Sequence, residues 1–319
     1  MLLGEERLEY VARAMSHERM RSETAAWLHG LTSAIHAAAG GRAIVAVDQE
    51  MPGMQRLHRL VPPLPAHAAL ASLPEAEIEA AVAVTAAEAA RLGVTLFLAP
   101  ILDVYREPAP QLAGRVILGS PADVARVGVA YVRGARTAGI AAAAKHFPGE
   151  GRAQADPHLG EVRIGRDRAA LEADLVPFRA AIEAGVEAIM LGAAIAESID
   201  PAVAASISTA AVSLLRDELG FTGVVVTDDL DMRGIEAGRG VIPTVEAALR
   251  AGADLLLLPG GRHALTFAEA IVAAVETGRV DRARVAEAAA RVRALATNLG
   301  WQECRVRAHW RRRVFVYVA

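Results

Sequence analysis

The chain has 319 residues, of which 53% are hydrophobic and 22% charged, and its formal net charge is -3. A chain of this length and composition can bury a large core, which excludes disorder as its main state. The small net charge gives no long-range attraction to nucleic acid or to an anionic membrane, so we expect a small neutral molecule as its partner.

The cellular location is predicted from the cysteine count and the N-terminus. Cys304 is the one cysteine of the chain, so no internal disulfide can form, and the first residues lack the apolar core of a signal peptide. No apolar run reaches the roughly 18 to 20 residues that span a bilayer. We therefore expect a soluble, cytoplasmic monomer that binds neither membrane nor nucleic acid.

Short apolar runs alternate with longer amphipathic segments. The runs that predict strands cover 43–47, 94–98, 140–144, 188–191, 223–226 and 253–258, and the segments that predict helices include 75–92, 121–138, 168–183 and 244–251. This alternation is typical of βαβ units around a buried parallel sheet. We predict an α/β fold with a single (β/α)8 barrel of the TIM type over residues 1–300. A doubly wound sheet is the alternative, but no glycine-rich phosphate loop follows the first strand.

The two ends of the chain fit a barrel less well. Residues 1–40 contain no clear strand, so we expect the barrel to be irregular at its first strand. Residues 301–319 form a basic tail with five arginines before a short apolar run. This tail is compatible with a late strand, an interaction segment or a shifted reading frame at the end of the gene.

Lys145 and His146 end a predicted strand and run into a Gly/Pro-rich loop that continues to Asp156 and His158. Strand ends converge on the face of a barrel where active sites form, and such loops often carry functional groups. Asp156 can hold the imidazole of His158 in one tautomer and raise its basicity, which suits proton transfer near neutral pH. Taken alone, the pattern fits an ordinary surface loop better.

Two further clusters follow predicted strands. Asp228 and Asp229 come after 223–226, where one carboxylate can act as a nucleophile or both can cap the following helix. Asp48 follows 43–47, and Arg56 lies eight residues later. Charged groups at such a place need a partner, so Asp48 and Arg56 form an ion pair or together bind a ligand.

Five motifs in one order resemble the β-N-acetylglucosaminidases of glycoside hydrolase family 3. They are Val47-Asp48-Gln49-Glu50, Ala99-Pro100-Ile101-Leu102-Asp103-Val104, Lys145-His146-Phe147-Pro148-Gly149, Asp156-x-His158, and Gly220-Phe221-x-Gly223 through Asp228-Asp229-Leu230-x-Met232. The resemblance covers about residues 43 to 260. It implies a retaining glycosidase that releases a terminal β-linked N-acetylglucosamine or related sugar from a glycoside or muropeptide-like substrate.

The resemblance also implies roles for individual residues. Asp228 would be the nucleophile that forms a glycosyl-enzyme intermediate, and His158, paired with Asp156, would be the general acid/base. The residues expected to bind sugar hydroxyls are Asp48, Arg56, Arg115, Lys145 and His146. No metal or organic cofactor is implied, because no Cys/His cluster has ligand spacing.

The chain departs from the family pattern at several positions. Met51-Pro52-Gly53 replaces the usual Gly-Gly-Arg, Glu150 replaces a loop histidine, and Ala193 stands where another histidine is usual. Two other functions stay open. A histidine acid/base suits phosphorolysis, in which phosphate replaces water, because it avoids the repulsion that an anionic carboxylate would exert on phosphate. The altered residues at 51–53 and 193 suit a catalytically silent binding protein.

Overall fold

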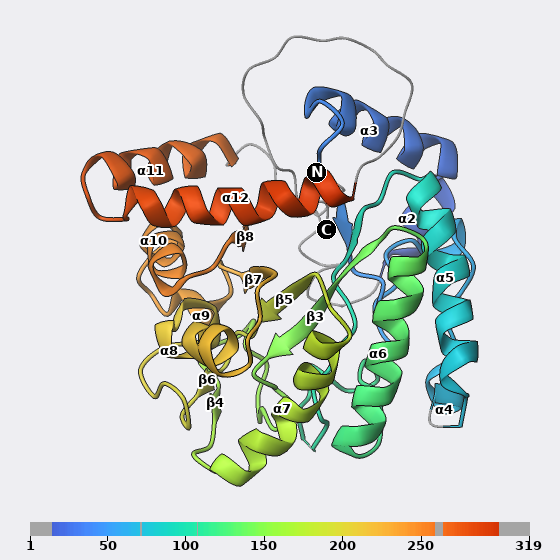
Figure 1. The fold of residues 1–319 in the computed structure, drawn as a ribbon, viewed down its shortest axis with the longest axis horizontal. Helices are drawn as coiled ribbons and strands as arrows, with labels where there is room; N and C mark the ends of the chain where they lie inside the picture. The colour runs from blue at the N-terminus through green and yellow to red at the C-terminus, as the bar shows by residue number, and fades with distance from the viewer. Residues whose placement is uncertain (1–14, 71, 107, 259–263, 300–319) are drawn as a thin grey trace.

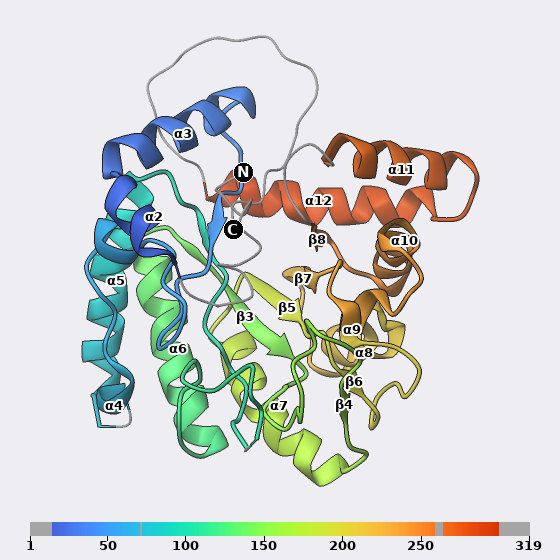
Figure 2. The ribbon, with the colours of Figure 1, turned by 180° about the vertical axis from the view of Figure 1, so that it is seen from behind.

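The computed structural model describes residues 15–70, 72–106, 108–258 and 264–299, and Figures 1 and 2 show it from two sides. Its strands are β1 (Ala46–Val47), β2 (Leu96–Phe97), β3 (Ala141–Phe147), β4 (Arg163–Ile164), β5 (Ala188–Leu191), β6 (Ile195–Ala196), β7 (Val224–Asp229) and β8 (Leu255–Leu257). Its helices are α2 (His17–Ser22), α3 (Ala25–Ala38), α4 (His67–Leu70), α5 (Glu75–Arg91), α6 (Pro121–Thr137), α7 (Arg168–Glu183), α8 (Thr209–Ser213), α9 (Arg233–Glu236), α10 (Val241–Ala251), α11 (Ala264–Glu276) and α12 (Arg282–Asn298).

Six strands form one curled parallel sheet in the order β1-β2-β3-β5-β7-β8, and β4 pairs with β6 beside it (Figure 1). The pairing is parallel throughout, for example Ala46 with Leu96 and Met190 with Val226. The α/β class and the parallel sheet are therefore confirmed. A closed ring of eight strands stays a prediction, because the sheet of described strands begins at β1 and ends at β8.

The two faces of the sheet carry separate hydrophobic clusters, because successive side chains of a strand point to opposite faces. Phe97 packs in the cluster that includes Tyr131 of α6, on the face covered by α5, α6 and α7. Leu96 and Met190 belong to the other cluster, which includes Val292 of α12. The sheet is thus buried on both faces, as parallel sheets are.

Local sequence explains how α6 is placed. Ser120 and Asp123 form a capping box at its N-terminus, with Pro121 at the first helical position. Gly134 lies where α5 and α6 cross, and a Cβ on it would stand 2.5 Å from the carbonyl oxygen of Glu79. The missing side chain therefore allows the two helices to approach closely.

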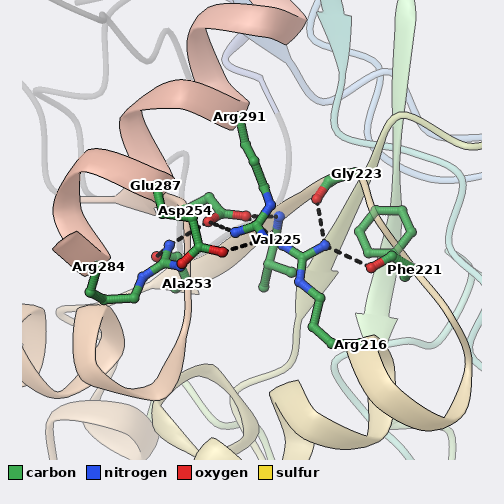
Figure 3. Close-up of polar contacts among 9 residues, drawn as sticks. All are labelled: Arg216, Phe221, Gly223, Val225, Ala253, Asp254, Arg284, Glu287 and Arg291. Carbon is green, nitrogen blue, oxygen red and sulfur yellow. Dashed lines mark hydrogen bonds and ion pairs between the residues drawn. The ribbon is translucent and has the colours of Figure 1, made fainter.

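A buried ion cluster fixes α12 across the end of the sheet where the strands begin (Figure 3). Asp254, directly before β8, has a fully buried carboxylate. It accepts from Arg216 at 2.6 Å, from Arg284 and Arg291 of α12 at 2.5 and 3.2 Å, and from the main chain of Val225 at 3.1 Å. The cluster therefore lies at the end of the sheet opposite the carboxyl ends of the strands.

The predicted elements agree with the structure in the middle of the chain. The six predicted strands correspond to β1, β2, β3, β5, β7 and β8, and the four predicted helices to α5, α6, α7 and α10. Within residues 1–40, the described part forms α2 and α3 and no strand; residues 1–14 and the basic tail 301–319 lie outside the described residues. None of the helices in the described ranges is long and apolar enough to cross a membrane.

Candidate active site

A network of four charged side chains lies at the carboxyl edge of the sheet, on the β1, β2 and β3 side. Lys145 donates to Asp48 at 2.6 Å and lies 2.7 Å from Glu50. Arg115 donates to both carboxylate oxygens of Glu50, at 2.6 and 3.0 Å. Parallel pairing of β1, β2 and β3 brings these residues together from distant parts of the chain.

The charges of this network stabilise one another. Burial alone would raise the pKa of Glu50, but Lys145 and Arg115 lower it well below its usual range. Burial would lower the pKa of Lys145, but Asp48 and Glu50 raise it above its usual value. Glu50, Lys145 and Arg115 are therefore charged at neutral pH. The Asp48 side chain is 17% exposed, so this carboxylate can still accept from a ligand.

The departure from the family pattern at 51–53 wraps around Glu50. Gly53 has a φ of +115°, and a Cβ there would lie 2.5 Å from Oε2 of Glu50. The main-chain N–H of Met54 donates to the same oxygen at 2.8 Å. A glycine is therefore needed at this position, and the segment holds the buried carboxylate in place.

Arg56 is buried close to Asp48, but the two side chains form no ion pair. The main-chain N–H of Arg56 donates to the carbonyl oxygen of Asp48 at 2.9 Å. Within the described residues, Nε and Nη1 of Arg56 have no hydrogen-bond partner. Of the two alternatives for Asp48 and Arg56, the ion pair is therefore wrong. Ligand binding, for which this guanidinium has unmet donors, stays a prediction.

His146 is held by a buried carboxylate that follows β2. Its Nδ1 lies 2.7 Å from Oδ2 of Asp103, whose Oδ1 accepts from the main chain of Glu150 at 2.6 Å. Burial lowers the pKa of His146, but Asp103 raises it above its usual value. This contact fixes the ring through Nδ1 and leaves Nε2 for a ligand.

Asp228 lies in β7, close to its carboxyl end, and is partly exposed. Its main-chain N–H donates to Oγ of Ser206 at 3.0 Å, and its Oδ1 accepts from the N–H of Asp229 at 2.8 Å. The field of Asp228 raises the pKa of both Arg115 and His146, each of which is first lowered by burial. Asp228 is therefore near enough to Arg115 and His146 for its charge to act on both. The cap position of α9 is occupied by Met232, so the helix-cap alternative for both aspartates is wrong.

Asp156 and His158 are paired as the sequence predicts. Oδ1 of Asp156 lies 2.7 Å from Nδ1 of His158 and accepts from its main-chain N–H at 3.0 Å. The carbonyl oxygen of Pro157 accepts from the N–H of Gly234 in α9, which follows β7. The loop is therefore anchored next to the strand of Asp228, with 24% of the His158 side chain exposed.

Sequence reasoning did not assign a role to four residues that organise the site: Glu50, Asp103, Glu150 and Ser206. Glu50 and Asp103 lie shortly after the ends of predicted strands, and this position could have marked them as site residues. Ser206 lies in a short 3-10 turn, 22 residues before the main-chain N–H that it holds. No local pattern marks it. The described residues contain no group of three or more His, Cys, Asp or Glu that could hold a metal ion.

Comparison with known proteins identifies the family. The model of the glycosyl hydrolase family 3 N terminal domain matches residues 16–295. A β-hexosaminidase of Pseudomonas aeruginosa is 37% identical over 231 residues, which is 70% of this chain and 68% of that protein. A β-hexosaminidase of Nitrosomonas eutropha is 32% identical over 274 residues, or 82% of this chain and 79% of that protein.

Solved structures support the same family. A family 3 β-N-acetylglucosaminidase from Paenibacillus sp. str. FPU-7 superposes with a TM-score of 0.83 at 32% identity, covering 90% of this chain and 57% of that one. A β-N-acetylhexosaminidase from Beutenbergia cavernae has a TM-score of 0.77 at 31% identity, covering 86% and 84%. The chain therefore belongs to glycoside hydrolase family 3 and is a relative of its β-hexosaminidases.

Proposed function

We propose that this chain, a glycosyl hydrolase of the β-hexosaminidase type, releases a terminal β-linked N-acetylglucosamine or related sugar by double displacement. The observation that carries the proposal is the partly exposed carboxylate of Asp228 beside the charged network, with the Asp156–His158 pair anchored next to its strand. The substrate class follows from the names of the relatives. A muropeptide-like glycoside fits that class.

The first chemical step uses Asp228 and His158. An oxygen of Asp228 attacks the anomeric carbon while Nε2 of His158 gives its proton to the leaving oxygen, so that a glycosyl ester forms as the glycosidic bond breaks. Asp156 accepts a hydrogen bond from Nδ1–H and stabilises the imidazolium form of His158, which becomes neutral when the Nε2 proton leaves. Water, deprotonated by His158, then attacks the ester and frees the sugar with its configuration retained.

Two members of the charged network, Lys145 and Asp48, supply the sugar contacts together with His146 and Arg56. Lys145, Nε2 of His146 and the unmet donors of Arg56 can donate to hydroxyl oxygens, and Asp48 can accept from hydroxyl groups. Arg115 has a different role, because its Nε and Nη2 bind Glu50 and its Nη1 binds the carbonyl oxygen of Gln111. We assign it to positioning Glu50. Cytoplasmic location and a monomeric state stay predictions.

The decisive experiment is release of 4-nitrophenol from 4-nitrophenyl N-acetyl-β-glucosaminide, with the glucoside as control substrate. Asp228→Asn should reduce kcat by ~10³-fold or more, as expected for a member of a catalytic unit. Asp217→Asn removes an exposed carboxylate and serves as the matched control. Wild-type turnover that survives in Asp228→Asn would remove Asp228 from its role.

The same assay separates the two competing functions. Adding inorganic phosphate tests phosphorolysis, because the product would be a sugar phosphate in place of the free sugar. A folded wild-type protein that turns over none of the tested glycosides would support the catalytically silent binding protein instead.

A further inference from the structure

Glu150 is a buried carboxylate that the mechanism above does not use. It is 3% exposed, and its Oε1 accepts from the main-chain N–H groups of Ala193 and Ala194 at 2.6 and 2.7 Å. Glu150 and Ala193 are two of the positions at which the chain departs from the family pattern, so the two departures lie in contact. They form one feature of this protein.

Glu150 contacts two groups of residues that belong to the site, one beside His146 and one beside the strand of Asp228. On one side, the main-chain N–H of Glu150 donates to Oδ1 of Asp103, and Oδ2 of Asp103 contacts Nδ1 of His146. On the other side, its side chain holds the chain that follows β5. That segment is also held by Ser206, whose hydroxyl donates to the carbonyl oxygen of Gly192 at 2.9 Å.

Ser206 in turn accepts from the main-chain N–H of Asp228 at 3.0 Å. Glu150 is therefore linked to the sugar-facing imidazole through Asp103 and to the strand of the nucleophile through 192–194 and Ser206. The backbone is shaped around this carboxylate, because a Cβ on Gly192 would lie 2.5 Å from Oε1 of Glu150.

We propose that Glu150 is a positioning residue that holds His146 and Asp228 in register through these two sets of contacts. The proposal rests on the proposed function, since it assigns a role within that site. An ionised carboxylate is the better acceptor for two main-chain N–H groups. The ionised form of Glu150 is therefore the one that supports the site.

The surroundings of Glu150 bring its pKa close to neutral pH. Burial raises its pKa to about 7, His146 opposes the rise, and Asp103 and Asp228 add to it. Asp174 of α7, paired with Arg152, faces the same loop at Gly149. A proton is thus gained or lost close to the nucleophile near neutral pH.

The test compares Glu150→Gln with Glu187→Gln. The first variant keeps the shape and a neutral acceptor but cannot ionise. The second removes a carboxylate that accepts from the main-chain N–H of Ala142 near the start of β3, so it bridges β3 and β5 outside the site. Both variants are first checked for the wild-type circular dichroism spectrum.

The kinetic measurement is kcat/KM on the 4-nitrophenyl substrate at pH 6 and pH 8. At pH 6 much of Glu150 is protonated in the wild type, so Glu150→Gln should resemble it. At pH 8 the variant should be slower by roughly tenfold to a hundredfold, the effect expected of a small misplacement of reacting groups. Glu187→Gln should follow the wild type at both pH values. A Glu150→Gln profile that matches the wild type at both pH values overturns the proposal.

The second measurement needs no turnover, so it separates failure of this inference from failure of the proposed function. The imidazole of His146 is titrated by nitrogen NMR, with the signal assigned by its loss in His146→Asn. Because ionised Glu150 raises the pKa of His146, Glu150→Gln should move that titration to lower pH and Glu187→Gln should leave it in place. An unmoved His146 titration in Glu150→Gln overturns the proposal whether or not the protein is active.

Discussion

At the scale of single residues, the charged network depends on a carboxylate that a substrate would not touch. Glu50 is fully buried and receives both Lys145 and Arg115. Those two cations have lost most of their contact with water, so their placement depends on this partner. A buried pair need not add stability, but removal of one member leaves the other without compensation.

Glu50→Gln should therefore destabilise the fold and weaken substrate binding. The expected loss is about 3 to 5 kcal/mol in the free energy of unfolding, typical of breaking a buried ion pair. The measurements are denaturant unfolding at pH 7 and KM. Glu218→Gln, an exposed glutamate, should change neither. A Glu50→Gln protein as stable as the wild type would show that the cations find other partners.

The positions of some site residues can be predicted from the sequence, whereas the contacts of others cannot. Asp48 and Asp228 follow apolar runs, so their place at the edge of the sheet can be derived from the run alone. The contact between Glu150 and Ala193 joins positions more than 40 residues apart, and nothing in either segment encodes it. Arg56 shows a third case, because its position was predicted but its main-chain contact with Asp48 depends on how the loop turns.

At the scale of elements, an ion pair ties the loop that carries Asp156 and His158 to α7. Arg152 donates to Asp174 at 2.6 Å. Burial raises the pKa of Asp174 to about 6, although Arg152 opposes the rise. The carboxylate is thus largely ionised, and the ion pair formed, above pH 6.

Asp174→Asn should loosen this loop and weaken acid catalysis by His158. The loss in kcat should be greater for an alkyl N-acetyl-β-glucosaminide than for the 4-nitrophenyl one, because a poor leaving group depends more on protonation. We expect ~10-fold or more on the alkyl substrate, within the usual range for general acid catalysis. Equal losses on both substrates would instead indicate a general effect on the fold.

Helix α12 and the buried ion cluster around Asp254 are the part of the fold that sequence patterns predict least. A helix over 282–298 was not predicted, and the convergence of Arg216, Arg284 and Arg291 on Asp254 joins three separate segments (Figure 3). The two-residue strands β4 and β6 are also too short to give an alternating pattern. Both depend on tertiary packing, which overrides local preference.

Asp254→Asn should release α12 before the rest of the molecule. The carboxylate is fully buried, so its loss leaves three guanidinium groups close together with only Glu287 as an acidic partner among the described contacts of α12. We expect a loss of about 3 to 5 kcal/mol. Amide hydrogen exchange should become faster in α12, and it should become faster in α6 to a smaller extent. Uniform acceleration across both helices would show that α12 unfolds together with the whole domain.

At the scale of the whole molecule, the protonated form of Glu150 favours stability, whereas its ionised form favours function. A buried carboxyl whose pKa is raised in the folded state holds its proton more tightly there than in the unfolded chain. Stability is therefore full below the unfolded value of 4.5 and falls as pH rises toward about 7. Glu50 behaves in the opposite way, because its lowered pKa adds stability above 4.5 that is lost in acid.

Glu150→Gln should consequently unfold at a higher temperature than the wild type at pH 8 and at about the same temperature at pH 5. The gain at pH 8 has an upper bound of about 3.5 kcal/mol, since the pKa rises from 4.5 to about 7 and one pH unit of that rise corresponds to about 1.4 kcal/mol. Melting curves at the two pH values measure it. The same variant is expected to be slower at pH 8, so a more stable and less active protein would show that the wild type keeps an unfavourable buried charge for its site. A variant that melts below the wild type at pH 8 would show that the two hydrogen bonds to Oε1 outweigh the burial of the charge.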